Sequence, residues 1–153
     1  MKIIPFALLV MASAVPVFAQ KITVSPSATQ ATQAAPAASF TGTARIEWRF
    51  AADEPGRASG GMVSFAAGAR THWHSHPLGQ TLIVTKGVGR VQQWGESIQE
   101  IREGDIVRIP PNVKHWHGAS PESAMSHLAI GERLDGQSVE WMEPVSDTDF
   151  AAT

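Results

Sequence analysis

Histidine is the residue type whose distribution in this 153-residue chain points most clearly to chemistry. All six histidines lie between His72 and His127, and the chain contains no cysteine. The lack of cysteine excludes thiol catalysis, cysteine-ligated zinc, iron–sulfur clusters and disulfide bonds. Neutral imidazole nitrogens are good ligands for first-row transition metals. The clustered histidines therefore predict a metal site.

Three of the histidines occur at every second position of one segment. His72, His74 and His76 lie within residues 70–76. Successive side chains of a β-strand point to opposite faces, so a strand over this segment would place the three rings on one face. Arg70 would share that face, and we expect it at the mouth of the site because it begins the strand.

A second segment, Lys114–Ala119, repeats the pattern with His115 and His117 on one face and Trp116 on the other. Two such strands, closed into a small barrel, would bring their histidines together in the interior. Trp116 and Trp73 would then lie in an outer core of the barrel or in a subunit interface. Lys114 is interpreted as a solvated charge at the strand edge, outside the site.

The elements that must position these histidines are short strands separated by glycine and proline. Many short strands at roughly ten-residue spacing, with no long amphipathic helix, predict an all-β fold, an antiparallel sandwich or barrel. A tight hairpin is expected at Trp94–Ser97 and a short helical turn at Asp147–Phe150. The expected strands are Arg45–Phe50, Val88–Trp94, Ile98–Arg102, Ile106–Ile109, Lys114–Ala119 and Met125–Ile130.

The beginning of the chain has a different character. Residues 1–19 resemble a cleavable signal peptide, with a short positive start, an apolar stretch and small residues before a cut after Ala19. An uncleaved membrane anchor is the alternative, but the apolar stretch is short and contains two prolines. Residues 20–39 lack aromatic residues and an apolar period, and they predict a flexible linker. A single folded domain over residues 40–150, periplasmic or secreted and free of the membrane after cleavage, is expected.

Charge and composition narrow the class of partner. The formal net charge is −2, 43% of residues are apolar, and no run of five basic residues occurs. A phosphate-backbone partner requires a basic patch, so nucleic-acid binding is not expected. A buried core and a small-molecule substrate are expected instead.

The histidine segments resemble the two motifs of the cupin superfamily. The first motif matches Gly68, His74, His76, Gln80 and Gly87 at the family spacing, with Gln80 where most members have Glu. The second matches Gly104, Pro110, Asn112 and His115, with Asn112 in place of a usual Gly and Ala119 in place of a usual Asn. The match covers about fifty residues, and it implies a single-domain cupin double-stranded β-helix, or jelly-roll, barrel.

Further strings, including residues 68–85, 114–119, 125–127 and 141–143, are similar to small bacterial cupins that include manganese-dependent hydroxynitrile lyases of the (R)-mandelonitrile type. The resemblance implies a metal held by His74, His76, Gln80 and His115, with Mn(II) as the first expectation and Fe(II), Zn(II) or Ni(II) as alternatives. Gln80 could instead be a spectator of a three-histidine site. His72 departs from the subgroup, where a small residue is expected.

The ligand set suggests a reaction. Three neutral imidazoles and one neutral amide would leave a divalent ion its full charge, and such a Lewis acid favours loss of a cyanohydrin proton and release of cyanide. A histidine must accept the proton. His127 is the first candidate, because the subgroup places this histidine in the cavity, followed by His117 and then His72. His127 could alternatively be a satisfied core residue.

Two other functions stay open at this point. Cupins also use such sites as dioxygenases or isomerases on small oxygenated substrates, although a Glu ligand is more usual there than Gln80. A non-catalytic module that binds a metal or a small ligand is compatible with the leader and the linker. The family implies a homodimer or homotetramer.

Overall fold

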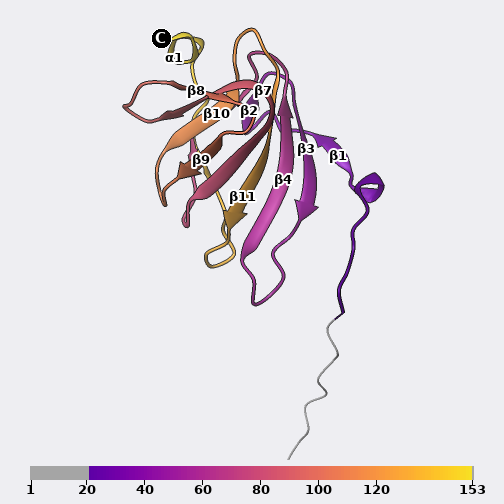
Figure 1. Ribbon diagram of the computed structural model, residues 1–153. Helices are drawn as coiled ribbons and strands as arrows, with labels where there is room; N and C mark the ends of the chain where they lie inside the picture. Colours follow the sequence, from indigo (N-terminus) through magenta and orange to yellow (C-terminus); the bar gives the residue numbers. More distant parts are fainter. Residues whose placement is uncertain (1–20, 153) are drawn as a thin grey trace, which may run out of the picture.

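The computed structural model describes residues 21–152. The predicted signal peptide, residues 1–19, lies outside the described residues. Strands dominate the described part of the chain, and they curl around a common interior while the N-terminal segment extends away from them (Figure 1). The predicted all-β barrel is confirmed.

The elements follow one another in a simple order. Within residues 21–152, twelve strands are accompanied by one 3-10 turn, η1 (Ser27–Thr29), and one short helix, α1 (Asp147–Ala151). The strands are β1 (Thr32–Ala34), β2 (Phe40–Thr41), β3 (Ala44–Phe50), β4 (Ala58–Phe65), β5 (Arg70–Thr71), β6 (His74–Ser75), β7 (Gln80–Gln93), β8 (Gln99–Arg102), β9 (Ile106–Ile109), β10 (His115–Ala119), β11 (Met125–Glu132) and β12 (Glu140–Trp141).

Strand β7 connects the two sides of the barrel. Its first part pairs with β9 and β11, and its second part pairs with β8 and β10, always antiparallel. The remaining neighbours give the order β1-β3-β4-β11-β7-β10-β5-β2, with β6 against β10 and β12. A long strand that passes from one sheet to the other curls the whole sheet, which is how β10 and β11 come to face a shared interior.

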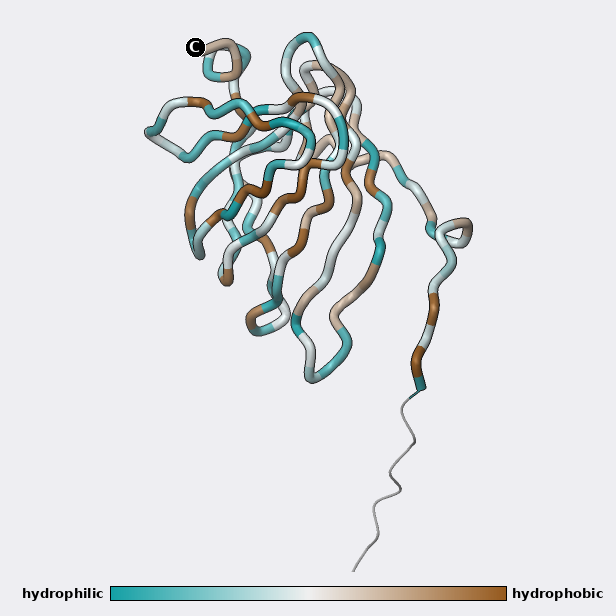
Figure 2. Tube along the Cα trace, in the orientation of Figure 1, coloured by the Kyte–Doolittle hydropathy of each residue, from teal (hydrophilic) through white to brown (hydrophobic). Residues whose placement is uncertain are grey.

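The interior core is apolar and well packed. It contains Phe65, Val84 and Met125, each at most 2% exposed, together with Phe40 and Val63. Burying one such side chain contributes about 1.5–3 kcal/mol. Along the strands of Figure 2, apolar residues alternate with polar ones, which is the period-2 pattern of strands that bury one face.

A second apolar cluster lies on the outer side of β10. Trp73 and Trp116 pack there against Val145 and Phe150, which come from the C-terminal end of the chain. The two tryptophans therefore lie opposite the histidines, as predicted. The chain's own C-terminus covers them, so they form an outer core.

Most strand predictions are confirmed, and two regions differ. Strand β7 is longer than expected, because it begins at Gln80 rather than at Val88. Within the stretch expected to be a linker, β1 pairs with β3, and Ala35 packs against the interior core. Its small residues allow this docking although they show no apolar period.

The segment 70–76 is the second difference. The sequence predicts one continuous strand there, but β5 ends at Thr71 and β6 begins at His74. The two-residue break shifts the alternation, so Thr71 and His74 both line the interior cavity. Arg70 points outward instead, where its guanidinium donates to the Val145 carbonyl at 3.0 Å and lies over the Phe150 ring. Its expected place at the mouth of the site is wrong.

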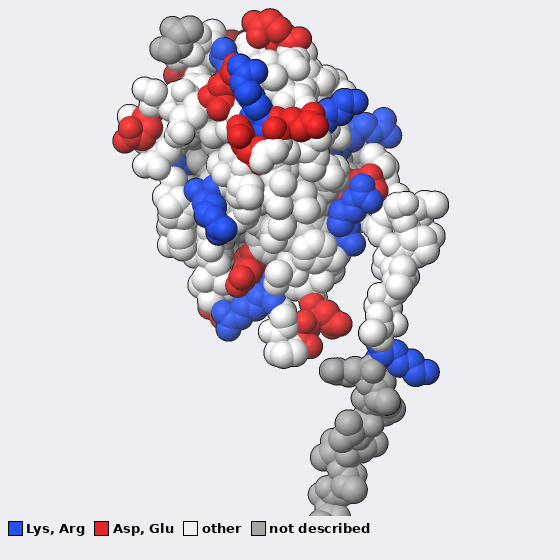
Figure 3. All heavy atoms as spheres, in the orientation of Figure 1, with Lys and Arg blue, Asp and Glu red and all other residues white. Residues whose placement is uncertain are grey.

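The surface is mixed in charge. On the face drawn in Figure 3, basic and acidic side chains are interspersed among uncharged residues. No helix among the described residues is long and apolar enough to cross a membrane.

Candidate metal centre

Five histidines converge inside the barrel from three neighbouring parts of the chain. β6 and the turn after it carry His74 and His76, β10 carries His115 and His117, and β11 carries His127. Their ring centroids lie 4.2 Å apart for His74 and His115, 5.1 Å for His74 and His76, and 4.7 Å for His117 and His127. All five side chains are buried.

Two of these rings are oriented by the carbonyl two residues earlier. The Nδ1 atom of His74 lies 2.9 Å from the His72 carbonyl oxygen, and that of His115 lies 2.9 Å from the Val113 carbonyl oxygen. A carbonyl oxygen can only accept, so each Nδ1 carries the proton. Each Nε2 is therefore left with a lone pair, which is the form in which a metal binds imidazole.

His76 is oriented by a distant part of the chain. Its Nδ1 donates to the Ser138 carbonyl, 62 residues further on, and its Nε2 is buried without a partner. Its backbone carbonyl accepts hydrogen bonds from the amides of Gly79 and Asn112, so the two sequence motifs meet at this residue. Asn112 and Gly79 both adopt a positive φ, which such a tight arrangement requires.

A fourth candidate ligand points to the same place. Gln80, the first residue of β7, holds its Oε1 atom 3.4 Å from Nε2 of His115. The structure thus brings together His74, His76, Gln80 and His115, as the sequence predicts for the site. Among the described residues, the histidines whose ligand atoms all lie within 4.8 Å of one another are His74, His115 and His117, so His117 meets this closer spacing and the expected ligand His76 does not.

These residues fit a divalent cation. Nε2 of His76 is buried with no hydrogen-bond partner among the described residues, an arrangement that costs free energy unless a metal or another ligand satisfies it. The donor set of imidazoles and one amide suits a first-row transition metal, and it matches no hard-cation cage of carboxylates.

Burial keeps the histidines neutral. Desolvation lowers the pKa of His115 to about 4, and it lowers the pKa values of His74 and His117 well below the usual 6.5. Neighbouring imidazoles lower the pKa values of His74 and His117 further, because two positive rings at this spacing repel. Metal binding requires unprotonated imidazole, so the site is in its binding form at neutral pH.

His117 and His127 form a hydrogen-bonded pair. Nε2 of His127 lies 3.1 Å from Nδ1 of His117, and the Phe65 ring packs against both. His117 lines the cavity, whereas His127 is fully buried behind it. Burial also lowers the pKa of His127 to about 4. A molecule in the cavity would therefore meet His117, the second candidate base, before His127.

His72 does not join the cluster. Its ring lies near the backbone of Ala38 and the side chain of Arg70, and the residue itself lies within the break between β5 and β6. The expectation that its ring shares a face with His74 and His76 is wrong, because the break changes the alternation. Its backbone carbonyl nevertheless orients His74.

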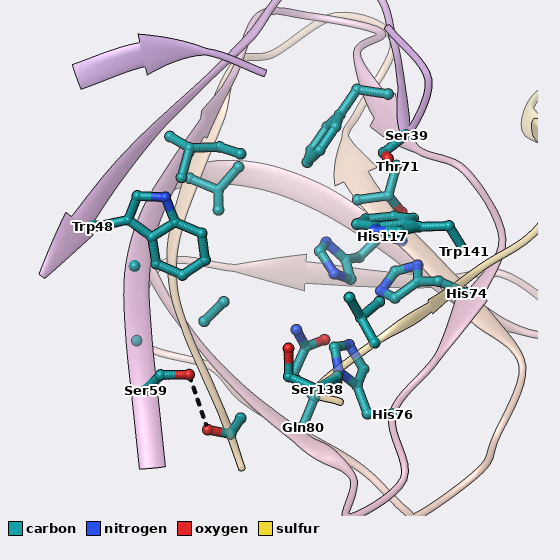
Figure 4. Close-up of a pocket in the computed structure, with 18 of the residues that line it drawn as sticks. Ser39, Trp48, Ser59, Thr71, His74, His76, Gln80, His117, Ser138 and Trp141 are labelled. Atoms are coloured by element: carbon teal, nitrogen blue, oxygen red, sulfur yellow. Dashed lines mark hydrogen bonds between the residues drawn. The ribbon is translucent and has the colours of Figure 1, made fainter. Parts of the chain in front are cut away.

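His74, His76 and His117 form one wall of a cavity of about 290 Å³. Figure 4 shows His74, His76, Gln80 and His117 pointing towards one space, with Trp48 across from them and Trp141 beside His74. Phe40, Ile46 and Val63 complete a largely apolar lining. Gly60 and Gly61 of β4 also line the cavity, and a Cβ at Gly60 would collide with the Phe50 ring.

Sequence reasoning missed several residues of this cavity. Trp141 packs on His74 in a tilted arrangement with 4.7 Å between ring centroids, and the Thr71 hydroxyl accepts a hydrogen bond from the His117 amide. Ser138 orients His76 through its carbonyl. A backbone acceptor leaves no mark on the sequence, and Trp141 reaches His74 through a strand pairing 67 positions apart in the chain.

Comparisons with known proteins identify the family. The family model for the cupin domain matches residues 61–131, which contain the three expected histidine ligands and Gln80. A protein of Granulicella tundricola named (R)-mandelonitrile lyase is 54% identical over 121 residues, which are 79% of this chain and 92% of that protein.

Solved structures show the same fold. A cupin-like protein from Thermotoga maritima is 39% identical, with a TM-score of 0.72 over 76% of this chain and 89% of that one. A cupin 2 conserved barrel domain protein from Rhodopseudomonas palustris has a TM-score of 0.62 at 19% identity, over 78% and 80% of the two chains. With its barrel, its two histidine motifs and these relatives, the chain belongs to the cupin family.

Proposed function

We propose that this protein is a metal-dependent hydroxynitrile lyase, which cleaves a cyanohydrin to a carbonyl compound and cyanide. The observation that carries the proposal is the convergence of neutral imidazole and amide donors at the wall of a small apolar cavity. The 54% identity to a protein named (R)-mandelonitrile lyase supports the same reaction.

The metal would be held by Nε2 of His74, His76 and His115 and by Oε1 of Gln80. Mn(II) is the first choice because of the resemblance to manganese-dependent hydroxynitrile lyases, and Fe(II), Zn(II) and Ni(II), which imidazole ligands suit, are alternatives. A bound divalent ion supplies Lewis acidity, which lowers the pKa of a hydroxyl group placed against it.

The protein's own base would be His117, with His127 behind it. Nε2 of His117 is buried, unpaired and adjacent to the cavity, so it can accept the hydroxyl proton of a cyanohydrin. The bond between the carbinol carbon and the nitrile carbon then breaks, and its electron pair leaves with cyanide. The proton held by His117 returns to the cyanide ion, so the histidine ends neutral. His127 stabilises the transient charge through its hydrogen bond to Nδ1.

The cavity restricts the substrate by size and polarity. Its 290 Å³ lies at the small end of ligand pockets, which favours a compact substrate. Trp48 and Trp141 provide flat apolar walls near the metal-binding atoms, and such walls pack well against an aryl group.

The test is release of benzaldehyde and cyanide from racemic mandelonitrile. Mn(II)-loaded protein, chelator-stripped protein and the His74→Ala variant are compared under identical conditions. Metal-dependent release that is lost in the variant supports the lyase. Bound Mn(II) without release above the buffer rate in any sample contradicts it, and would favour a metal-binding module without this activity.

A further inference from the structure

The C-terminal segment reaches from the metal-binding histidines to the outer core. We call residues 138–151 the C-terminal strap. It begins beside the cavity at Ser138, includes β12 and ends in α1, which lies near the end marked C in Figure 1. Its inner end contacts His76 and His74, and its outer end contacts Trp116 of β10.

The inner end of the strap touches two expected ligands. The Ser138 carbonyl accepts a hydrogen bond from Nδ1 of His76, and the Trp141 ring packs on His74 in a tilted arrangement. Trp141 also contacts the Phe40 ring with 5.8 Å between ring centroids. The orientations of two of the three expected histidine ligands therefore depend on this segment.

The middle of the strap pairs with the backbone of β6. In the register of β12 and β6, Trp141 lies opposite His74. Next to this pair, the Met142 amide donates to the Trp73 carbonyl at 2.9 Å, and the Trp73 amide donates to the Glu143 carbonyl at 3.0 Å. These bonds hold the short strand that carries His74, which is too short to be held by its pairing with β10 alone.

The outer end of the strap is an anchor. Phe150 is 8% exposed, packs on Trp116, and lies under the Arg70 guanidinium at 4.5 Å. The Arg90 guanidinium donates to the Phe150 carbonyl at 2.9 Å. Ser146 is the N-cap residue of α1, and its hydroxyl oxygen accepts a hydrogen bond from the Asp149 amide. The short helix that carries Phe150 is therefore capped.

We infer that the C-terminal strap orients His74 and His76 for metal binding, and that Phe150 is its positioning residue. The physical reason is that an imidazole binds a metal well only when its other nitrogen and its ring plane are held by the protein. Releasing the anchor would let the Ser138 carbonyl and Trp141 move away from the two rings. The inference rests on the metal-holding part of the proposed function and is independent of the reaction catalysed.

The experiment measures Mn(II) affinity by titration calorimetry in Phe150→Ala, with Met125→Ala as the matched control. Met125 is a buried residue of the interior core outside the strap, so its truncation destabilises the barrel without touching the anchor. Both variants should lose thermal stability. Measured well below both midpoints, Mn(II) affinity should fall about tenfold in Phe150→Ala and stay within twofold of wild type in Met125→Ala. Phe150→Leu, which refills most of the outer core, should recover most of the affinity.

A metal-free readout is the imidazole proton of His76. In wild-type apoprotein, nitrogen-resolved NMR should show a slowly exchanging Nδ1 proton on His76, and Phe150→Ala should lose it. If Phe150→Ala does not fold, Ser146→Ala removes only the cap of α1 and should shift both readouts in the same direction by a smaller amount.

The outcomes separate this inference from the proposed function. Equal Mn(II) affinity and an unchanged His76 proton in the folded strap variants overturn the inference alone. Failure of wild-type protein to bind Mn(II) overturns the proposed metal function and this inference with it. Equal losses of affinity in Phe150→Ala and Met125→Ala also overturn it, because general destabilisation would then account for the effect.

Discussion

At the scale of single residues, the six histidines have the same side chain but different roles. The group that each ring nitrogen contacts distinguishes these roles. His74, His76 and His115 each have Nδ1 occupied by a backbone carbonyl, which leaves Nε2 for a metal. His117 instead shares its Nδ1 with another imidazole. The side chain of His72 lies outside the cluster, and only its carbonyl contributes.

His72 provides the simplest test at this scale. We expect His72→Ala to keep Mn(II) affinity and cleavage rate within twofold of wild type, because the carbonyl that orients His74 remains. His76→Ala, two positions further on, should lower Mn(II) affinity by at least ~tenfold, since it removes an expected ligand. Metal titration of the two variants side by side checks this, and a large effect of His72→Ala would show that its ring acts on the site.

The two candidate bases should differ in their effect on rate. We expect His117→Ala to lower kcat for mandelonitrile cleavage by about 10²–10⁴-fold, because His117 lines the cavity. His127→Ala should lower kcat less, since His127 acts through its bond to His117. Single-turnover kinetics on Mn(II)-saturated variants give the comparison, and the reverse order would make His127 the base that meets the substrate.

At the scale of elements, the site depends on how β7 is held against its neighbours. The register between β7 and β11 shifts beside Ser126, close to Gly87, which adopts a positive φ. A Cβ at Gly87 would collide with the Ala124 carbonyl, so the backbone there permits only glycine. This bulge lets β11 present His127 to the interior while β7 continues to β10.

Gly87 in β7 and Gly95 just after it adopt nearly the same φ, so they form a matched pair. Gly87 and Gly95 have φ values of +79° and +83°, but a Cβ at Gly95 meets nothing within 4 Å. We expect Gly95→Ala to cost about 1–2 kcal/mol of unfolding free energy from the left-handed backbone alone. Gly87→Ala should cost more than that, because the Ala124 carbonyl must also move. Urea unfolding of both variants measures the difference, and equal costs would show that the clash is relieved freely.

At the scale of the whole molecule, the buried histidines make the metal-free fold sensitive to acid. Burial lowers the pKa values of His115 and His127 to about 4, against 6.5 in the unfolded chain. The unfolded state therefore binds more protons than the folded state between these values, so the free energy of unfolding falls as pH falls. Well above pH 6.5 these histidines are neutral in both states, so they cause no loss of stability there.

We therefore expect metal-free protein to lose stability steadily from about pH 6.5 to pH 4, by roughly 3 kcal/mol for each of these two histidines. Mn(II) should delay the loss, because protons and the metal compete for the same nitrogen atoms. Thermal unfolding midpoints across this pH range, with and without Mn(II), are the measurement. A flat profile for the metal-free protein would contradict the burial argument.

The signal peptide and the homodimer or homotetramer remain predictions at this scale. The N-terminal prediction is checked by mass spectrometry of protein expressed in a bacterial host, where a cut after Ala19 is expected. Light scattering of the purified domain measures its oligomeric state.

Much of the site was accessible from local pattern. Strand alternation placed His115 and His117 on one face of β10, opposite Trp116, because a regular strand has a strict period of two. Motif spacing identified His74, His76 and Gln80. The same alternation was wrong for His72 and Arg70, because a break in pairing between β5 and β6 interrupts the period, and nothing in residues 70–76 marks that break.

The order of residues along the chain was enough for the all-β class, the family resemblance and the expected ligands, since these depend on neighbouring residues and fixed spacings. The fold settled which histidine faces the cavity, which nitrogen of each ring is free, and which distant residues hold the rings. Ser138 and Trp141 join the site through pairings with His76 and His74 more than sixty positions away. Such contacts arise from how the barrel closes, and no local pattern encodes them.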